Sequence, residues 1–506
     1  MFKNIQDKLL ISNPLLWNLK IVPFACIALV FHAIFFLIGY SNGEVVFRDD
    51  YYSYYDGGFD SAVVIFFSVV ISILIGIVWL VLYSRNNAFK SFYPKSNFSL
   101  FKEFLYILLF TSLTSTFTLT YLYATDFRTR NYFSEEEVAK KLEILSLSTP
   151  FLEGSFVESN YVSVLVDGQY KNQTRENFKY RDRTYNLNSL MNKRVENDNS
   201  YYGTYTDSIL DQRVKNWLYN NQKDSVKWVF TEFMKIAREH NLKSNITADK
   251  WFSLVYNYPQ FEDYTVIRKS NSQDVYNDYS ATAVAVDVDS NGVAMPPSVD
   301  YARQPPSAFY VPYDSLLSGY REISKAQENP TIDLDSLYFY LYFAIGLAIA
   351  IFSFKVTSGR NWLIAMVSLG VFSLIVGIFS ALSAGTMFFI FYWLLFFGLL
   401  IHFFTTISMR TGKGISGITL NQILWLLPSF VPILYYCILD IAKKSSNYYA
   451  SSGKYVNGQF IAESFPKIEW MEDHFPEMMI GNIAIIILFI FLFSVQIKKW
   501  KGIAED

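Results

Sequence analysis

Residues 62–83 read AVVIFFSVVISILIGIVWLVLY, a stretch of 22 residues that contains no charged side chain. An α-helix needs about 20 apolar residues to cross the hydrocarbon core of a bilayer, so this stretch predicts a membrane span. Seven further stretches predict spans on the same ground. The eight predicted spans are 21–40, 62–83, 104–124, 337–354, 362–383, 387–407, 420–440 and 478–497.

A polar stretch of 211 residues, 125–335, separates the third predicted span from the fourth. It contains no cysteine and no apolar stretch long enough to cross a bilayer. Its local patterns indicate both helices and strands. We therefore expect a polytopic α-helical membrane protein of about eight transmembrane helices, with an inserted α+β extracytoplasmic domain.

The helix and strand patterns within 125–335 are specific enough to test. Ser134 and Glu137 form a capping-box pattern at the start of a helix. Apolar spacing predicts helices at about 207–220 and 224–240, and Thr247 is expected to cap a short helix that ends at Val255. Tyr161–Val166 alternates as a strand does and is followed by an Asp-Gly turn, which predicts a hairpin.

Five segments follow from this pattern. Residues 1–20 form an interfacial N-terminal segment, and residues 21–124 form three membrane helices with a cytoplasmic loop at 84–103. The soluble domain follows at 125–335, further membrane helices at 336–497 and a cytoplasmic tail at 498–506.

Composition indicates the class and compartment of the protein. Only 17% of the residues are charged, whereas soluble domains contain about 25%. The net charge of −2 gives no general attraction for nucleic acid. Both cysteines lie in predicted spans, so the soluble domain has no disulfide, and this pattern favours a bacterial inner-membrane protein.

Basic residues in the short loops predict the orientation. With the N-terminus in the cytoplasm, the inner segments contain 14 Lys and Arg residues and the short outer loops contain five. The positive-inside rule then places both termini in the cytoplasm and residues 125–335 outside it.

The sequence carries no strong motif for catalysis, a cofactor or a metal. The segment Asp287-Val-Asp-Ser-Asn-Gly292 matches the opening of a calcium loop, but Ser298 stands where the bidentate Glu is expected. A plain Asn-Gly hairpin turn is the alternative and is favoured. No phosphate-binding loop is present, so we expect no catalytic residue here and ATP hydrolysis, if any, on a separate subunit.

Polar residues and prolines inside predicted spans are candidates for a membrane path. Thr111, Ser115 and Thr118 share one face of span three, as a hydroxyl-lined path requires. The alternative is that they bond to their own helix or to a neighbour. Pro428 and Pro432 are expected to kink span seven, either as a gating hinge or as a simple bend.

Two histidines lie within predicted spans, His32 in span one and His402 in span six. Ionisable residues at membrane depth are candidates for function. The alternative, which is favoured, is that both are neutral and hydrogen-bonded within the helix bundle.

Small residues recur at every fourth position of span five, a pattern that is typical of close helix packing or of a homodimer contact. These residues are Ser373, Gly377, Ala381 and Gly385.

The loop 84–103 interleaves aromatic and basic residues at the predicted cytoplasmic surface. A positive-inside anchor requires only the charges, whereas a docking surface for a cytoplasmic partner also uses the rings. The candidate docking residues are Phe89, Lys90, Phe92, Tyr93 and Lys95.

The segment 9–18 and the loop 84–103 together resemble the entry helix and coupling helix of ABC-2-type bacterial exporter permeases. The resemblance is architectural and covers roughly residues 1–124. It implies a transport function with a separate cytoplasmic ATP-binding cassette subunit. The alternative hypothesis is a receptor, signalling or assembly protein that does not transport and whose outer domain binds an envelope protein.

Overall fold

A computed structural model describes most of the chain. The described residues are 8, 10–47, 60–85, 98–153, 161–166, 169–174, 178–185, 190–197, 205–261, 264–271, 308–328, 332–382, 386–410, 412–446, 448, 454–456, 459–461 and 464–503. The chain divides into two compact units. The membrane unit comprises residues 1–39, 59–124 and 331–506, and the inserted unit comprises residues 40–58 and 125–330.

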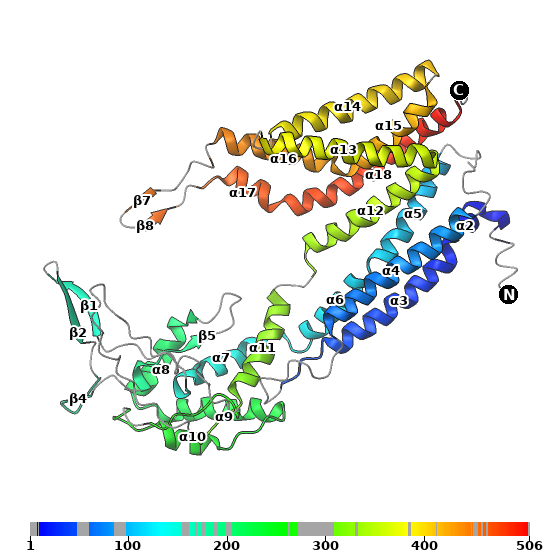
Figure 1. The fold of residues 1–506 in the computed structure, drawn as a ribbon. Coiled ribbons are helices and arrows are strands. Elements are labelled where there is room, and N and C mark those ends of the chain that lie inside the picture. The colour runs from blue at the N-terminus through cyan, green and yellow to red at the C-terminus, as the bar shows by residue number, and fades with distance from the viewer. Residues whose placement is uncertain are drawn as a thin grey trace, which may run out of the picture. The chain divides into compact units, whose positions relative to one another are not determined.

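Long apolar helices make up the membrane unit (Figure 1). In the described residues, seven helices are long and apolar enough to cross a membrane, and the bent pair α5–α6 raises this to eight if it forms one span. The prediction of a polytopic helical membrane protein is thereby confirmed. The helices are α2 (Pro14–Leu19), α3 (Ile21–Asn42), α4 (Ser61–Ser84), α5 (Ser99–Ser115), α6 (Phe117–Arg130), α12 (Leu334–Val356), α13 (Gly359–Leu382), α14 (Thr386–Met409), α15 (Lys413–Leu426), α16 (Phe430–Ser445), α17 (Pro466–Asp473) and α18 (Phe475–Lys501).

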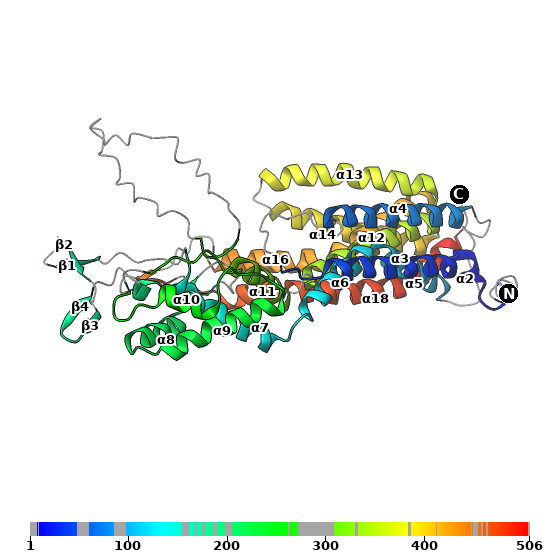
Figure 2. The same ribbon diagram turned by 90° about the horizontal axis from the view of Figure 1, so that it is seen from below.

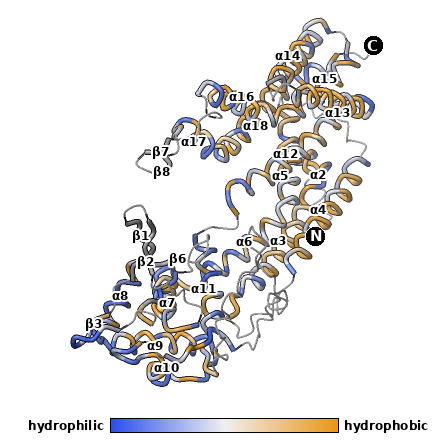
Figure 3. Tube along the Cα trace, turned by 60° about the vertical axis from the view of Figure 1, so that its left-hand side comes forward, coloured by the Kyte–Doolittle hydropathy of each residue, from blue (hydrophilic) through white to orange (hydrophobic). Residues whose placement is uncertain are grey.

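Helix α12 lies at the centre of the membrane unit and packs against α5, α15 and α18. Its buried face carries Ala344, Ala348 and Phe352, and small residues on this face allow close approach. Hydrophobic residues predominate along the membrane helices (Figure 3), and many of the large ones are exposed, among them Phe66, Leu374 and Leu394. Helices of this kind suit a lipid environment, because their exposed surface is hydrophobic.

The third predicted span is broken into two helices that are bent by 50°. Residues 98–130 contain neither proline nor glycine, so the break needs another cause. Ser115 and Thr116 donate hydroxyl hydrogen bonds to the carbonyls of Thr111 and Ser112, at 2.7 and 2.8 Å. Such back-bonding competes with the helical hydrogen-bond ladder and bends helices.

The inserted unit is built mainly of helices (Figure 2). Helices α8, α9 and α11 all pack against α7, and α10 packs against α9. Phe230, Phe233 and Trp251 are fully buried at the centre of this cluster. The helices are α7 (Glu135–Ser148), α8 (Ser208–Tyr219), α9 (Lys223–Glu239), α10 (Ala248–Val255) and α11 (Tyr313–Glu328).

The strands that the structure describes in the inserted unit form three separate antiparallel pairs. These are β1 (Tyr161–Val166) with β2 (Gln169–Thr174), β3 (Phe178–Tyr180) with β4 (Arg183–Tyr185), and β5 (Glu196–Asn197) with β6 (Tyr205–Thr206). A fourth pair, β7 (Lys454–Val456) with β8 (Gln459–Ile461), belongs to the membrane unit. Strand content is low, so the predicted α+β character of the insert is only weakly shown.

Several local predictions for the inserted unit are confirmed. Ser134 and Glu137 form a complete capping box at the start of α7. The side chain of Thr247 accepts a hydrogen bond from the Lys250 amide and caps α10. The predicted helices near 207–220 and 224–240 are α8 and α9, and the β1–β2 hairpin has the predicted turn position. The calcium-like segment 287–292 lies outside the described residues.

The segment 40–58, which follows the first predicted span, belongs to the inserted unit although two predicted spans separate it from 125–330. Val45 is buried in the hydrophobic core of this unit, and Phe47 packs against the same core. Local pattern does not reveal this contribution, because the segment is short and the contacts that bury it are distant in sequence.

Candidate functional site

The membrane unit holds a buried ion pair between Glu103 of α5 and Lys355 of α12. The Glu103 and Lys355 side chains are 4% and 1% exposed. Tyr83, in the last turn of α4, donates its hydroxyl proton to the Glu103 Oε1 atom at 2.8 Å. Three helices therefore meet at one carboxylate, near the end of the membrane unit that is predicted to be cytoplasmic.

Sequence reasoning missed this pair, because both residues fall just outside the predicted spans 104–124 and 337–354. One signal was available for Glu103: it lies four residues before Ile107 and next to Phe104, on the stripe that forms the buried face of α5. Lys355 gave no such signal, because a basic residue at a span end is also expected of a positive-inside loop.

Two of the three candidate hydroxyl residues of span three bond to neighbouring helices. Thr111 donates to the Ala344 carbonyl of α12 at 3.0 Å. Thr118 bonds the Ser68 hydroxyl of α4 at 2.6 Å, whereas Ser115 bonds back to its own helix. The structure thus brings Thr111 and Thr118 into contacts between helices. Whether they line a path stays a prediction.

His32 joins α3 to the two sides of the α5–α6 break. Its Nε2 atom lies 2.8 Å from the Leu113 carbonyl oxygen, and its Nδ1 atom lies 2.6 Å from Thr120 Oγ1. A carbonyl oxygen only accepts, so Nε2 carries a proton, and in the neutral ring Nδ1 accepts from the Thr120 hydroxyl. The ring also packs edge-on against Phe117. His402, by contrast, is exposed on α14.

Pro428 lies in a short 3-10 turn, Leu427–Ser429, that joins α15 to α16, and Pro432 follows in the first turns of α16. The Pro428 carbonyl accepts a hydrogen bond from Asn482 of α18 at 2.9 Å. The span is therefore interrupted where the prolines predict it, and the interruption is held by a neighbouring helix.

Three of the four small residues of span five lie in the described part of the chain, and all three are exposed. Ser373, Gly377 and Ala381 are exposed on α13, and nothing described lies within 4 Å of a Cβ built at Gly377. Gly385 lies outside the described residues. Close packing is found instead at Gly39 of α3, where a Cβ would overlap the Tyr121 carbonyl of α6. The predicted homodimer contact stays a prediction.

All five docking candidates of the loop 84–103 lie outside the described residues, which end at Arg85 and resume at Phe98. They are Phe89, Lys90, Phe92, Tyr93 and Lys95. Phe98 stacks on Phe491 of α18, with ring centroids 4.7 Å apart.

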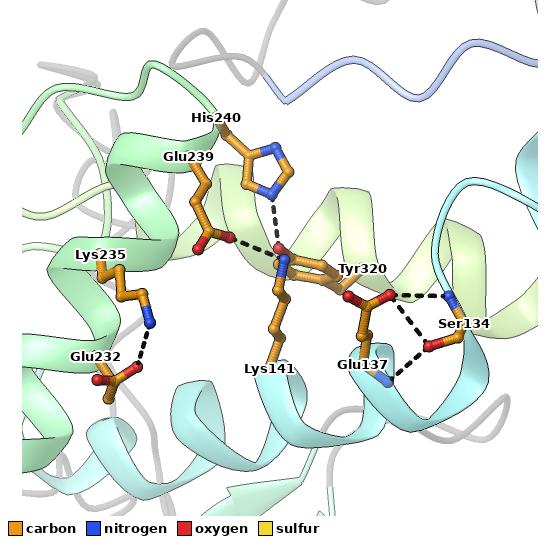
Figure 4. Close-up of polar contacts among 8 residues, drawn as sticks. All are labelled: Ser134, Glu137, Lys141, Glu232, Lys235, Glu239, His240 and Tyr320. Carbon is orange, nitrogen blue, oxygen red and sulfur yellow. Dashed lines mark hydrogen bonds and ion pairs between the residues drawn. The ribbon is translucent and has the colours of Figure 1, made fainter.

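The inserted unit contains a second polar cluster, centred on Tyr320 of α11 (Figure 4). The His240 Nε2 atom lies 2.6 Å from the Tyr320 hydroxyl, and Phe47 stacks on the imidazole. Lys141 pairs with Glu239 at 2.9 Å beside them. Burial, and next the Lys141 charge, lower the pKa of His240 to about 4, so the ring is neutral at pH 7.

Lys193 is a further buried charge that sequence reasoning missed. Its Nζ atom donates to the Leu152 carbonyl at 2.7 Å and lies 4.7 Å from the centre of the Tyr264 ring. Burial, with Lys269 as a second cause, lowers the pKa of the Lys193 amine to about 8. The neighbouring sequence carries no pattern that sets this lysine apart.

The described residues contain no group of three or more His, Cys, Asp or Glu side chains that is placed to hold a metal ion. What they do contain is a bent helix pair with a buried ion pair at one end and a histidine at its break. Searches with the chain found no match among protein-family models, none among curated proteins and none among solved structures.

Proposed function

We propose that this chain is the membrane subunit of a bacterial transport system, working with a separate ATP-hydrolysing subunit at its cytoplasmic side. One observation carries the proposal: the α5–α6 pair is bent by 50° within the membrane unit and bears ionisable contacts at its break and at one end. Interrupted helices of this kind form substrate sites in many transporters, because they free backbone groups inside the membrane.

Ionisable residues in membrane segments support the same reading. Burying Glu103 and Lys355 costs several kcal/mol per ion before their attraction is counted. A membrane anchor needs no such pair, and its spans can be uniformly apolar. A buried ion pair between helices of the membrane unit therefore favours a moving or conducting part of a protein.

The energy source is proposed to lie on a second chain. The sequence has no phosphate-binding loop, and its first 124 residues resemble a permease that is driven by an ATP-binding cassette subunit. In this proposal the loop 84–103 faces the cytoplasm and meets that subunit, while residues 125–330 lie outside the cytoplasm.

The proposal is tested by purifying the full chain from its native membrane in a mild detergent. We expect an ATPase subunit to copurify, and we expect Phe92→Ala with Tyr93→Ala to lose it while the chain reaches the membrane in normal amounts. Phe66→Ala with Phe67→Ala is the matched control, because it removes two exposed rings of α4 that lie outside this loop. Recovery of no ATPase with the unaltered chain would contradict the proposal.

A receptor or assembly function is the second candidate, and exposed side chains of the inserted unit favour it. Ile209 is 76% exposed, Tyr219 is 54% exposed and Trp228 is 48% exposed. Tyrosine and tryptophan often dominate binding energy at protein interfaces. If this function is correct, Trp228→Ala in the full chain reduces crosslinking to an envelope protein and leaves any ATPase bound.

A further inference from the structure

We infer that a groove between α12, α13 and α15 binds one acyl chain of a phospholipid. The groove has a volume of about 340 Å³ and lies wholly within the membrane unit. Its walls include Gly346, Ala350, Trp362, Met366, Trp425 and Pro428. The volume falls at the lower end of the range of small-molecule sites, roughly 300–1,000 Å³. This inference does not depend on the proposed transport function.

The walls of the groove present carbon rather than hydrogen-bonding groups. The Trp362 indole N–H donates to the Ala350 carbonyl at 3.2 Å, and the Trp425 indole N–H donates to the Ser353 hydroxyl at 3.0 Å. The two indole rings meet edge to face, with centroids 5.4 Å apart. A polar ligand would lose its water here and gain no partner from these donors, so the groove selects an apolar occupant.

Small residues on α12 create the hollow. Gly346 and Ala350 are four positions apart and so lie on one face of the helix. A Cβ built at Gly346 meets nothing described within 4 Å, so the space in front of it is open. A long unbranched chain can lie along such a face.

The surroundings identify the occupant as a lipid. The groove opens to the outer surface of the helices, because Met366, which forms part of its wall, is 46% exposed. Every helix that lines it belongs to a segment apolar enough to cross a membrane. Arg360 is exposed in the first turn of α13, two residues before Trp362, and supplies a positive charge for a phosphate group.

The test is native mass spectrometry of the full chain after purification in detergent. We expect one phospholipid to remain on the unaltered chain and on Gly370→Leu, which adds the same side chain to an open position of α13 outside the groove. Gly346→Leu fills the groove and should reduce the retained lipid at least about tenfold. Arg360→Gln should shift the retained lipid from anionic to zwitterionic species.

Met366→Trp fills the groove from the opposite wall and should lose the lipid as well, which separates the effect from misfolding of a single variant. Equal lipid retention by the unaltered chain, Gly346→Leu and Met366→Trp would overturn the inference. Retention of a detergent or free fatty acid in place of a phospholipid would overturn it too.

Discussion

The membrane unit and the inserted unit each bury a tyrosine hydroxyl against a titratable side chain, but they treat charge in opposite ways. Tyr83 donates to Glu103, whose carboxylate also meets the Lys355 ammonium, and that pair is at most 4% exposed. Tyr320 meets His240, whose ring is kept neutral, while the charged Lys141–Glu239 pair lies at the edge, 17% and 42% exposed.

This difference in the charge of the buried groups determines how much each polar contact contributes to stability. In the membrane unit the charges are buried together, so neither can be removed without leaving the other in a low dielectric. Beside Tyr320 in the inserted unit the histidine is uncharged and Glu239 of the neighbouring ion pair is 42% exposed, so this ion pair contributes less. Four expectations, some with a companion variant, test this contrast from the largest expected effect to the smallest.

The largest effect is expected for Lys355→Met. This variant keeps the volume of the side chain but leaves the Glu103 carboxylate buried without its partner, which costs about 3–5 kcal/mol. Thermal unfolding of the full chain in detergent should show a large fall in the midpoint.

The double variant Glu103→Gln with Lys355→Met should recover most of that stability. It removes both charges, and the amide oxygen of the introduced glutamine still accepts the hydrogen bond from the Tyr83 hydroxyl. If the single and double variants unfold at the same temperature, the pair is not the source of the effect.

A smaller effect is expected for Phe47→Ala, which removes an aromatic stack without changing any charge. Phe47 is partly buried, so the expected loss is about 2–3 kcal/mol, below the range for a fully buried Phe. Hydrogen exchange of α9 and α11 in the full chain measures it.

Gly319→Ala supplies the matched test of this contact. A Cβ at Gly319 would overlap the Phe47 ring, so the substitution should destabilise the unaltered chain. In the Phe47→Ala background the same change should stabilise α11 by up to about 1 kcal/mol, because alanine favours helix. If Gly319→Ala changes the stability in the same direction in both backgrounds, the packing described for Phe47 is contradicted.

The third expectation concerns pH. The pKa of His240 is about 4 in the folded chain and 6.5 in the unfolded chain. Between pH 4 and 6.5 the ring is therefore protonated in the unfolded chain and neutral in the folded chain. Stability of the inserted unit should therefore be full above pH 6.5 and fall as the pH drops toward 4. Because the ring is only partly buried, we expect about 1–2 kcal/mol.

Local opening of α9, measured by hydrogen exchange with intrinsic rates corrected for pH, reports this change. His240→Gln removes the titrating group and should flatten the dependence. If the pH dependence of α9 opening is the same in His240→Gln as in the unaltered chain, His240 is not the source of the effect.

The smallest effect is expected for Glu239→Gln, which breaks the pair with Lys141. Lys141 is 17% and Glu239 is 42% exposed, so water still reaches the pair. Ion pairs at the surface contribute about 0.2–1 kcal/mol, and we expect the unfolding midpoint of the inserted unit to change little. Raising the salt concentration should remove what difference there is. A loss comparable to that of Lys355→Met would erase the contrast between the two units.

Local patterns were enough to predict the membrane helices and several elements of the inserted unit. The apolar stretch 62–83 became α4, and the Ser134–Glu137 pattern became a complete capping box, because both depend on neighbours within a few residues. Glu103 with Lys355 and Phe47 with His240 depend on partners that are distant in the sequence. No spacing rule connects residues that far apart.

Glycine illustrates the same limit. Gly377 belongs to a regular small-residue pattern, yet nothing described lies near it, whereas Gly39 meets the backbone of α6 directly. A pattern of small residues states that close approach is possible. Only the fold determines which helix makes that approach.

The inserted unit takes its core from two stretches of chain, 40–58 and 125–330, and this imposes an order on biosynthesis. Val45 and Phe47 leave the ribosome first, and most of the chain must be made before residue 330 follows. At about 5–20 residues per second this takes roughly 15–55 s. During that time the two side chains have no core to enter. Because the second and third predicted spans lie between these two stretches, the core of this unit can form only after both spans have been made. Folding of the inserted unit therefore depends on the insertion of these two spans.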